Sequence, residues 1–249
     1  MMEILGIDIG GSGIKAALVD IKKGEFTSER IRIPTPQKGK PGKVADVVGD
    51  LVKQFNYEDI VGVGFPGPII YEQALLAANI DDSWLGKNVK SILQTKIGNE
   101  FVVINDADAA GIAEMYYGVG QGQKGTVLIL TLGTGIGTAV FYDGKLLPNI
   151  ELGHLEIRGK DAEKRAAAVV RTKKKLSWKK WAKNLEEYIN AIESYIYPDM
   201  IIIGGGISKD SDKFIPYINS RAMLVPAKML NKAGIIGAAR NAYDYHTVK

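Results

Sequence analysis

The sequence predicts an α/β protein built of two similar halves that face each other across a cleft. The first observation behind this prediction is a repeat, in which an apolar strand, a glycine-rich turn and a second strand occur at residues 5–19 and again at 130–142. The second is that helical apolar spacing alternates with short apolar segments in both halves, as is typical of helices packed on sheets. The third is the length of 249 residues, which gives enough core for one large or two modest domains.

The first half begins with an antiparallel meander and continues as an α/β unit. Its three opening strands are expected at about residues 2–9, 14–21 and 28–33, with turns at 10–13 and 22–24. A loop rich in Pro, Lys and Gly follows at 34–42, and apolar residues at helical spacing from Val44 to Phe55 predict a helix. The remaining elements are a strand at 60–65, a helix near 87–96, a buried strand at 101–104 and an Ala-rich helix at 107–116.

The second half repeats this plan. Strands are expected at residues 126–132, 137–141 and 200–203, and a last helix at about 231–243. From Ser177 onward one helix carries an apolar stripe that is better explained as core than as a stacking platform, formed by Trp178, Trp181, Leu185, Tyr188, Ile192 and Tyr195. We place the boundary near Ala109, with an N-terminal domain at 1–109 and a C-terminal domain at 110–249 whose last helix is free to pack back on the first.

Composition excludes several classes of function. The chain is 46% hydrophobic and 24% charged, with no apolar run near the roughly 20 residues that span a bilayer and no cationic leader before the first strand, so we expect a cytoplasmic protein with no membrane partner. The absence of cysteine rules out disulfides, thiolate catalysis and cysteine-ligated zinc, and two histidines leave little for another transition-metal site. The metal site that the composition still allows is one for a hard cation held by oxygen ligands.

Positive charge is concentrated in one segment. Residues 158–183 contain eleven Lys or Arg and two acidic residues, a local charge of +9 in a chain of net charge +4. We define the basic patch as the members of this segment expected to meet a ligand, namely Arg171, Lys173, Lys174, Lys175, Lys179 and Lys180. Because neighbouring like charges repel, this density favours a polyanionic partner over a merely solvated face, although a cationic loop in water is the competing explanation.

The two glycine turns suggest a clamp for phosphate. A dinucleotide-binding loop needs a helix directly after its glycines, whereas here a second strand follows, so any anion must be held by turn amides and side chains. Glycine allows positive φ and close approach, and successive amides then form an anion-binding nest. Ser12, Lys15, Thr134 and Thr138 could add donors. Either turn alone is better explained as an ordinary hairpin, and the repetition is what favours the functional interpretation.

Asn105 and Asp106 follow an apolar strand, where ligands gather in α/β sheets. A carboxylate there can take a proton from a substrate hydroxyl, and the neighbouring amide can orient the same substrate. The competing explanation is a helix cap, which is common for these residue types before a helical segment. The two roles are compatible.

Two further segments carry polar groups or glycines near strand ends. Residues 151–156 place Glu151, His154 and Glu156 close together after the second hairpin, which suits recognition of sugar hydroxyls. Metal binding is the alternative, but one His with one nearby Glu offers few ligands for zinc. Residues 203–208 run from a strand through glycines to a helix start at Ser208 or Asp210, which indicates either close approach to a donor or a tightly packed turn.

These segments together resemble the ROK family (repressors, open reading frames, kinases) of the actin-like phosphotransferases and, within it, the branch of the polyphosphate glucokinases. The resemblance covers nearly the whole chain and rests on residues 6–15, 132–137 and 203–206, and most specifically on 151–165 and 176–182. It implies two actin-like (ribonuclease H-like) α/β domains flanking a central cleft. It also implies a phosphotransferase that moves the terminal phosphoryl group of polyphosphate, or also of ATP, to the 6-hydroxyl of glucose, with Mg²⁺.

The resemblance assigns roles to individual residues. Asp106 is the implied general base, and Asp8 is implied to lie near the Mg²⁺-bound phosphates and to contact the ion through water. Glucose would be held by Asn79, Asn105, Asp106, Glu151, His154 and Glu163. The donor would be held by Asp8, Gly10, Gly11, Ser12, Gly13, Lys15, Thr131, Gly133, Thr134, Gly135, Gly204, Gly205 and Gly206. Polyphosphate would extend over the basic patch, and a homodimer is the family expectation.

One departure matters, because typical ROK members follow the Glu-x-Gly-His segment with a zinc-binding cysteine cluster that this chain lacks. We therefore expect no zinc, and Glu163 is the nearest match to the glutamate that closes the cluster. Alternatives are an ATP-dependent glucokinase or glucomannokinase and a non-catalytic sugar sensor. A nucleic-acid binder is a further alternative from the patch alone, but it would leave the segment at 151–156 without a purpose, so we expect no nucleic acid.

Overall fold

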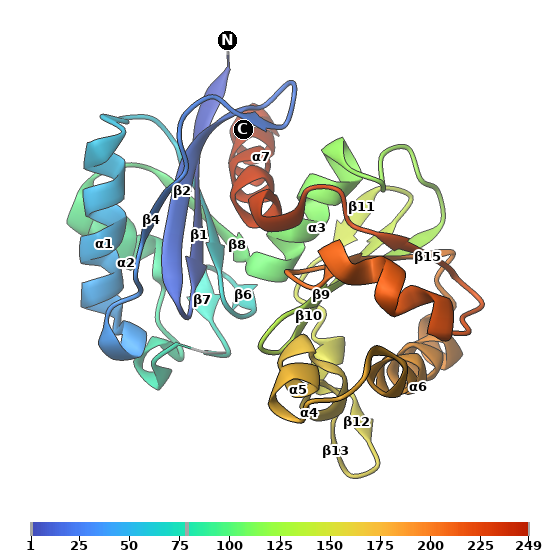
Figure 1. Ribbon diagram of the computed structural model, residues 1–249. Helices are drawn as coiled ribbons and strands as arrows, with labels where there is room; N and C mark the ends of the chain where they lie inside the picture. The colour runs from blue at the N-terminus through green and yellow to red at the C-terminus, as the bar shows by residue number, and fades with distance from the viewer. Residues whose placement is uncertain (1, 78–79, 249) are drawn as a thin grey trace. The chain divides into compact units, whose positions relative to one another are not determined.

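The computed structural model describes residues 2–77 and 80–248 and consists of two compact units (Figure 1). Unit 1 comprises Met1–Ala113 and Lys232–Lys249, and unit 2 comprises Glu114–Asn231. Each unit has its own sheet and its own helices, so each is described by itself. Asn79, predicted to bind glucose, lies outside the described residues.

Unit 1 is built on a sheet with strand order β3-β2-β1-β5-β8, to which β4 adds by pairing with β2. The strands are β1 (Glu3–Gly10), β2 (Gly13–Asp20), β3 (Glu25–Phe26), β4 (Ile31–Ile33), β5 (Val61–Phe65) and β8 (Phe101–Asn105). Strands β1 and β2 pair antiparallel along their whole length, whereas β5 lies parallel to both β1 and β8. The parallel strands are almost wholly apolar because both faces of the sheet are covered.

The helices of unit 1 are α1 (Pro41–Gln54), α2 (Val89–Ile97), most of α3 (Asp106–Tyr117) and α7 (Ala233–Val248). Helix α1 buries its apolar stripe, including Val44, Val48 and Leu51, against the sheet core. Helix α7 contacts β1, β5 and β8, and it approaches α3 so closely that a Cβ built on Gly237 would lie 1.6 Å from the Ala109 carbonyl oxygen. Short elements complete the unit: η1 (Gln37–Gly39), β6 (Ile69–Ile70), β7 (Gln73–Ala74) and η2 (Asp82–Trp84).

Unit 2 repeats the sheet of unit 1, with strand order β11-β10-β9-β14-β15. Its strands are β9 (Thr126–Leu132), β10 (Ile136–Tyr142), β11 (Lys145–Leu147), β14 (Met200–Gly204) and β15 (Met223–Pro226). As in unit 1, an antiparallel hairpin is followed by two parallel strands. The predicted α/β class and the repeat of its plan are therefore confirmed.

The helices of unit 2 cover this sheet and form the second core. They are α4 (Glu163–Ala166), α5 (Ala168–Lys173) and α6 (Trp178–Ile196), with η3 (Leu152–His154), η4 (Ser208–Lys213), η5 (Ile215–Tyr217), η6 (Leu230–Lys232) and the hairpin β12 (Glu156–Ile157) and β13 (Lys160–Asp161). Helix α6 buries Trp181 and Tyr188, as its stripe predicts, and the Trp181 ring contacts Phe214 at 5.0 Å. Tyr195 does not belong to the core, because it lies in the last turn of α6 and is 74% exposed.

Two predicted elements differ from those observed. The strand expected at 28–33 is shortened to β4 (Ile31–Ile33), because the amide of Leu18 bonds the Ser28 side chain at 3.0 Å and not the backbone of this segment, while β3 lies before the expected strand. The helix expected from Ser208 is the 3₁₀ segment η4, which is kinked at Asp210 (φ −106°). None of the helices within residues 2–77 and 80–248 is long and apolar enough to cross a membrane.

Candidate functional site

The first glycine turn of unit 1 connects β1 to β2 and is fixed by side chains from β4 and the loop after it. Gly10 pairs with Gly13, and the chain between them carries Gly11 and Ser12. Arg32 Nη2 donates to the Ser12 carbonyl at 2.8 Å, and the Thr35 hydroxyl donates to the Gly10 carbonyl. Because both carbonyls accept hydrogen bonds from side chains outside the turn, the turn is held in one conformation.

Asp8 and Lys15 lie opposite each other on β1 and β2, and Lys15 Nζ is 2.8 Å from Asp8 Oδ2. Both side chains keep part of their surface exposed, at 17% for Asp8 and 27% for Lys15. The pair therefore presents one carboxylate and one ammonium beside the first turn. A carboxylate oxygen in this position suits a hard cation such as Mg²⁺, which proteins commonly hold by one or two carboxylates and substrate phosphates.

Asn105 ends β8 and caps α3. Its Oδ1 accepts hydrogen bonds from the amides of Ala107 at 2.8 Å and Asp108 at 3.0 Å, and the side chain is 2% exposed. The capping explanation is thus observed, and it fixes the backbone from which the half-buried Asp106 projects. Asp108, which the sequence analysis did not single out, is fully buried in the same first turn, where the helix amides favour negative charge.

In unit 2, residues 151–154 are bonded to β10, and we call them the hexose segment after the role that the sequence predicts for them. Glu151 precedes η3, and His154 ends it. The Thr138 hydroxyl donates to the Ile150 carbonyl and accepts from the Leu152 amide at 3.0 Å. Thr138 was expected to add a donor for phosphate, but it is 2% exposed and holds this segment instead.

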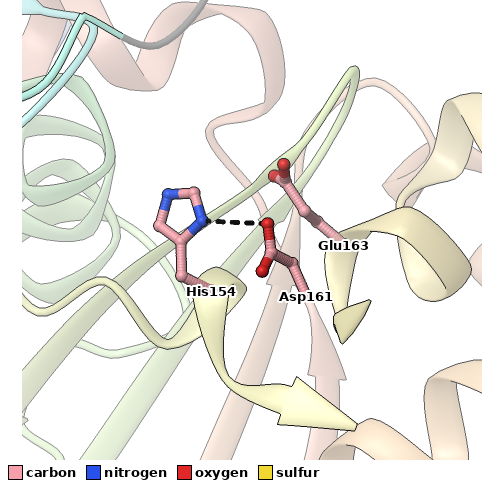
Figure 2. Close-up of side chains that lie close together, drawn as sticks. All are labelled: His154, Asp161 and Glu163. Atoms are coloured by element: carbon pink, nitrogen blue, oxygen red, sulfur yellow. Dashed lines mark ion pairs between the residues drawn. The ribbon is translucent and has the colours of Figure 1, made fainter. Parts of the chain in front are cut away.

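His154, Asp161 and Glu163 form one cluster, shown in Figure 2, in which candidate ligand atoms lie within 4.8 Å of one another. His154 Nδ1 is 3.7 Å from Asp161 Oδ2, and Lys164 Nζ is 3.0 Å from the same oxygen. The hydrogen bond from Lys164 lowers the pKa of Asp161, so this carboxylate stays ionised. One imidazole and two carboxylates can receive several hydroxyls or hold a cation. Asp161 is the member that the sequence analysis missed.

The second glycine turn connects β9 to β10 and is braced from two sides. Glu163 Oε2 accepts a hydrogen bond from the Ile136 amide at 3.2 Å, and the Val169 amide donates to the Gly133 carbonyl at 3.0 Å. Thr131 and Thr134 lie on β9 and in the turn itself. The expected nest based on positive φ is wrong for both hairpin turns, because Gly10, Gly11, Gly13, Gly133 and Gly135 do not adopt positive φ. Close packing explains the glycine at position 135, where a built Cβ would lie 2.4 Å from Glu163 Oε2.

The third glycine segment lies beside the second turn. Gly204 of β14 pairs with Thr131 of β9, and Gly205 has φ 82° with no room for a side chain against the Leu132 carbonyl. The Ser208 hydroxyl donates to the Gly205 carbonyl at 2.8 Å. The predicted donor residues of unit 2, up to Gly206, are therefore brought together on adjacent strands.

The basic patch occupies α5, the start of α6 and the residues between them. Its five lysines are exposed, and none of them lies within 4.0 Å of a carboxylate in the described part of the chain. Arg171 differs from the five lysines because its guanidinium group packs on an aromatic ring, with its central carbon 3.5 Å from the centre of the Trp178 ring. Because the Val169 amide bonds Gly133 at 3.0 Å, the helix that carries Arg171 and Lys173 starts at the second glycine turn.

Tyr188, which the sequence predicts to be a core residue, also carries a buried hydroxyl near the predicted sugar-binding carboxylates. It is fully buried, and within the described residues its hydroxyl has no hydrogen-bond partner. Burial, together with the charges of Glu151 and Glu163, raises the pKa of Tyr188, so the hydroxyl stays protonated near these two carboxylates. Tyr188 belongs to the core cluster against which Leu152 packs, so α6 and the segment at 151–154 share this core.

Comparison with known proteins agrees with this arrangement. Residues 4–166 match the model of the ROK family. The chain is 46% identical over 235 residues to the polyphosphate glucokinase of Mycobacterium tuberculosis, covering 94% of this chain and 89% of that protein. It is similar to the solved structure of the inorganic polyphosphate/ATP-glucomannokinase of Arthrobacter sp. strain KM, with a TM-score of 0.95, 47% identity and coverage of 99% of this chain and 100% of that one. A ROK family glucokinase of Streptomyces griseus, solved with glucose and AMPPNP, has a TM-score of 0.84 at 23% identity over 98% of this chain and all of that one, which shows the shared fold alone.

Proposed function

The chain belongs to the ROK family, and from that premise we propose that it transfers the terminal phosphoryl group of inorganic polyphosphate to the 6-hydroxyl of glucose. It is then a phosphotransferase with an alcohol group as acceptor. Its similarity to the Mycobacterium tuberculosis polyphosphate glucokinase, at 46% identity over 94% of the chain, supports this activity. The structural observation that carries the donor assignment is the hydrogen bond from Val169 to Gly133, which joins the helix of the basic patch to a glycine turn.

Glucose is held by hydrogen bonds to carboxylate, imidazole and amide groups. Glu151, His154 and Glu163 supply these groups in unit 2, and Asn105 with Asp106 supplies them in unit 1. Asn79 is proposed for the same role from the sequence. A carboxylate accepts hydrogen bonds at both oxygens, and imidazole both donates and accepts, so this set matches an acceptor with several hydroxyls.

Asp106 acts as the general base. As O6 of glucose attacks the terminal phosphorus, the O6 proton passes to the Asp106 carboxylate, and the bond from that phosphorus to its bridging oxygen breaks. The products are glucose 6-phosphate and a polyphosphate shortened by one unit. The Asn105 cap on α3, with bonds of 2.8 and 3.0 Å, supports this role because it fixes the backbone at Asp106.

The phosphates need charge neutralisation more than covalent chemistry. Turn amides at Gly11–Gly13 and Thr134–Gly135, the ammonium of Lys15 and the glycines Gly204–Gly206 supply donors, and the basic patch binds the remainder of the polyphosphate chain. Asp8 would hold Mg²⁺ through water, and the ion supplies neutralisation of the phosphoryl oxygens when it is bound. The Asp8 carboxylate beside the first turn fits this ion, since the side chain is partly exposed.

A coupled assay of glucose 6-phosphate, run with polyphosphate and with ATP in turn, tests the proposal. We expect product with polyphosphate in the presence of Mg²⁺. Product with ATP alone would replace the donor assignment, and glucose binding without product from either donor would indicate a sugar sensor instead.

A second candidate differs in breadth and not in chemistry. The Arthrobacter protein, 47% identical to this chain, is named as a glucomannokinase that uses polyphosphate or ATP. The similarity to that protein favours activity of this chain with mannose as acceptor and with ATP as donor as well. Repeating the assay with mannose in place of glucose decides between the two.

A further inference from the structure

Glu163 contacts the second glycine turn of unit 2 directly. Its Oε2 accepts a hydrogen bond from the Ile136 amide at 3.2 Å. The same oxygen would lie 2.4 Å from a Cβ built on Gly135, so the carboxylate rests against the backbone of the turn. A side chain at position 135 would therefore push the Glu163 carboxylate off the turn.

The same side chain reaches the hexose segment. Glu163 belongs to the cluster with His154 and Asp161, whose candidate ligand atoms all lie within 4.8 Å of one another (Figure 2). Asp161 already has Lys164 at 3.0 Å as its partner, whereas Glu163 forms no ion pair within 4.0 Å in the described part of the chain. Since a carboxylate offers about four acceptor positions, Glu163 retains capacity for a hydroxyl.

The backbones of the two segments are also in contact. A Cβ built on Gly153 would lie 2.1 Å from the Ile136 carbonyl oxygen, so η3 packs against the strand that leaves the glycine turn. The amide and the carbonyl of Ile136 thus face Glu163 and Gly153 respectively. Ile136 therefore links the hexose segment to the second glycine turn, and a ligand bound at either one is separated from the other by this single residue.

We propose that Glu163 couples the binding of the two substrates. A hexose hydroxyl donates to the carboxylate while Oε2 stays on the Ile136 amide, so a bound sugar fixes the carboxylate and, through it, the turn that receives the phosphoryl donor. This inference rests on the proposed function and adds to it a positive linkage between acceptor and donor. By reciprocity the donor must strengthen sugar binding by the same factor.

Binding of 6-deoxyglucose tests this linkage without turnover, because that sugar lacks the hydroxyl to be phosphorylated. Its dissociation constant is measured by titration calorimetry with and without saturating polyphosphate and Mg²⁺. For the wild-type protein we expect polyphosphate to lower the dissociation constant by about fivefold or more, the usual range for coupled sites. In Glu163→Ala we expect weaker sugar binding and a ratio close to one.

Two further variants separate coupling from general damage. Glu58→Ala removes the same charge from an exposed position between α1 and β5, outside the residues assigned to either substrate, and should keep the wild-type ratio. Gly135→Ala displaces the carboxylate from the turn, because its Cβ would meet Oε2 at 2.4 Å, and should lower the ratio. Circular dichroism checks that each variant is folded.

The outcomes are distinct. If Glu163→Ala binds the sugar weakly yet keeps the full ratio, Glu163 is a sugar contact only and the coupling role is wrong. If the wild-type protein binds both ligands independently, the role is also wrong while the proposed function stands. A folded wild-type protein that binds neither ligand overturns the proposed function itself.

Discussion

Replacing Lys173, Lys174 and Lys175 together with alanine should reduce the salt dependence of polyphosphate use. The three side chains are exposed and have no carboxylate within 4.0 Å among the described residues, so each is available to a polyanion. Binding of a flexible polyanion releases counterions, and each neutralised charge contributes about 0.7 to the slope of log affinity against log salt.

The expected size of the effect follows from the six residues of the basic patch. If all six neutralise phosphates, the slope is about −4, and affinity falls about 300-fold between about 50 and 200 mM salt. With three lysines removed the slope is about −2 and the fall about 20-fold over the same range. ATP carries few charges, so its dependence on salt should be small in both proteins.

The assay is steady-state kinetics with each donor at several salt concentrations, with KM for polyphosphate as the readout. The matched control replaces Lys22, Lys23 and Lys145, which lie in the β2–β3 turn and on β11, and lowers the net charge by the same amount. An unchanged slope in the patch variant, or an equal change in the control, would refute the assignment of the patch.

Three further predictions concern catalysis and stability. Asp106→Asn should lower kcat by a factor of about 10² or more, as expected for loss of a general base, with an unchanged circular dichroism spectrum; near-normal turnover would remove Asp106 from this role. Gly237→Ala should destabilise the protein by about 1–3 kcal/mol in urea unfolding, because its Cβ would lie 1.6 Å from the Ala109 carbonyl, whereas Gly49→Ala, with a nearest contact of 3.5 Å, should stabilise by up to about 1 kcal/mol. The pKa of Glu193 is lowered, since burial acts to raise it but hydrogen bonds from a nearby hydroxyl and two amides outweigh burial. Its stabilising effect is therefore present above its ordinary pKa of 4.5 and lost as the pH falls through the lower folded value, so Glu193→Gln should show a smaller loss of unfolding free energy on acidification than the wild type.

The hairpins and their glycine turns were predictable because their patterns are local. An apolar strand followed by glycine and a second strand defines the register once the turn length is known, and the observed pairing of Gly10 with Gly13 follows it. The same register places Asp8 opposite Lys15, so their ion pair at 2.8 Å could also have been predicted. The family and the glucose kinase activity were recognised from these motifs, and the family is confirmed.

The contacts of Glu163 with Ile136 and of Asp161 with His154 could not be predicted, because they depend on how the hairpin β12–β13 and the helix α4 fold back on β10. No local pattern gives such a distance. The same holds for the purpose of Gly135, which looked like a need for positive φ and is instead close packing with a carboxylate.

The stripe of α6 was predictable as far as the helix stays against the sheet, which includes Trp181 and Tyr188. It fails at Tyr195, which is exposed although the next residue, Ile196, packs against the core. From Ile192 the buried face continues to the position four residues on, whereas the predicted stripe continued to the position three residues on. The late start of β4 has a different, local cause, since the Ser28 hydroxyl takes the place of a backbone partner for the Leu18 amide.

Transfer to the sugar oxygen is the central claim, and ³¹P NMR of the reaction with polyphosphate and glucose labelled with ¹⁸O at position 6 tests it most directly. If O6 attacks the terminal phosphorus, the glucose 6-phosphate signal carries the isotope shift of a P–¹⁸O bond. The end-group signal of polyphosphate also grows relative to the signal of its internal phosphates, because the chains become shorter. Release of inorganic phosphate without labelled glucose 6-phosphate, from folded protein with Mg²⁺ present, would contradict the account.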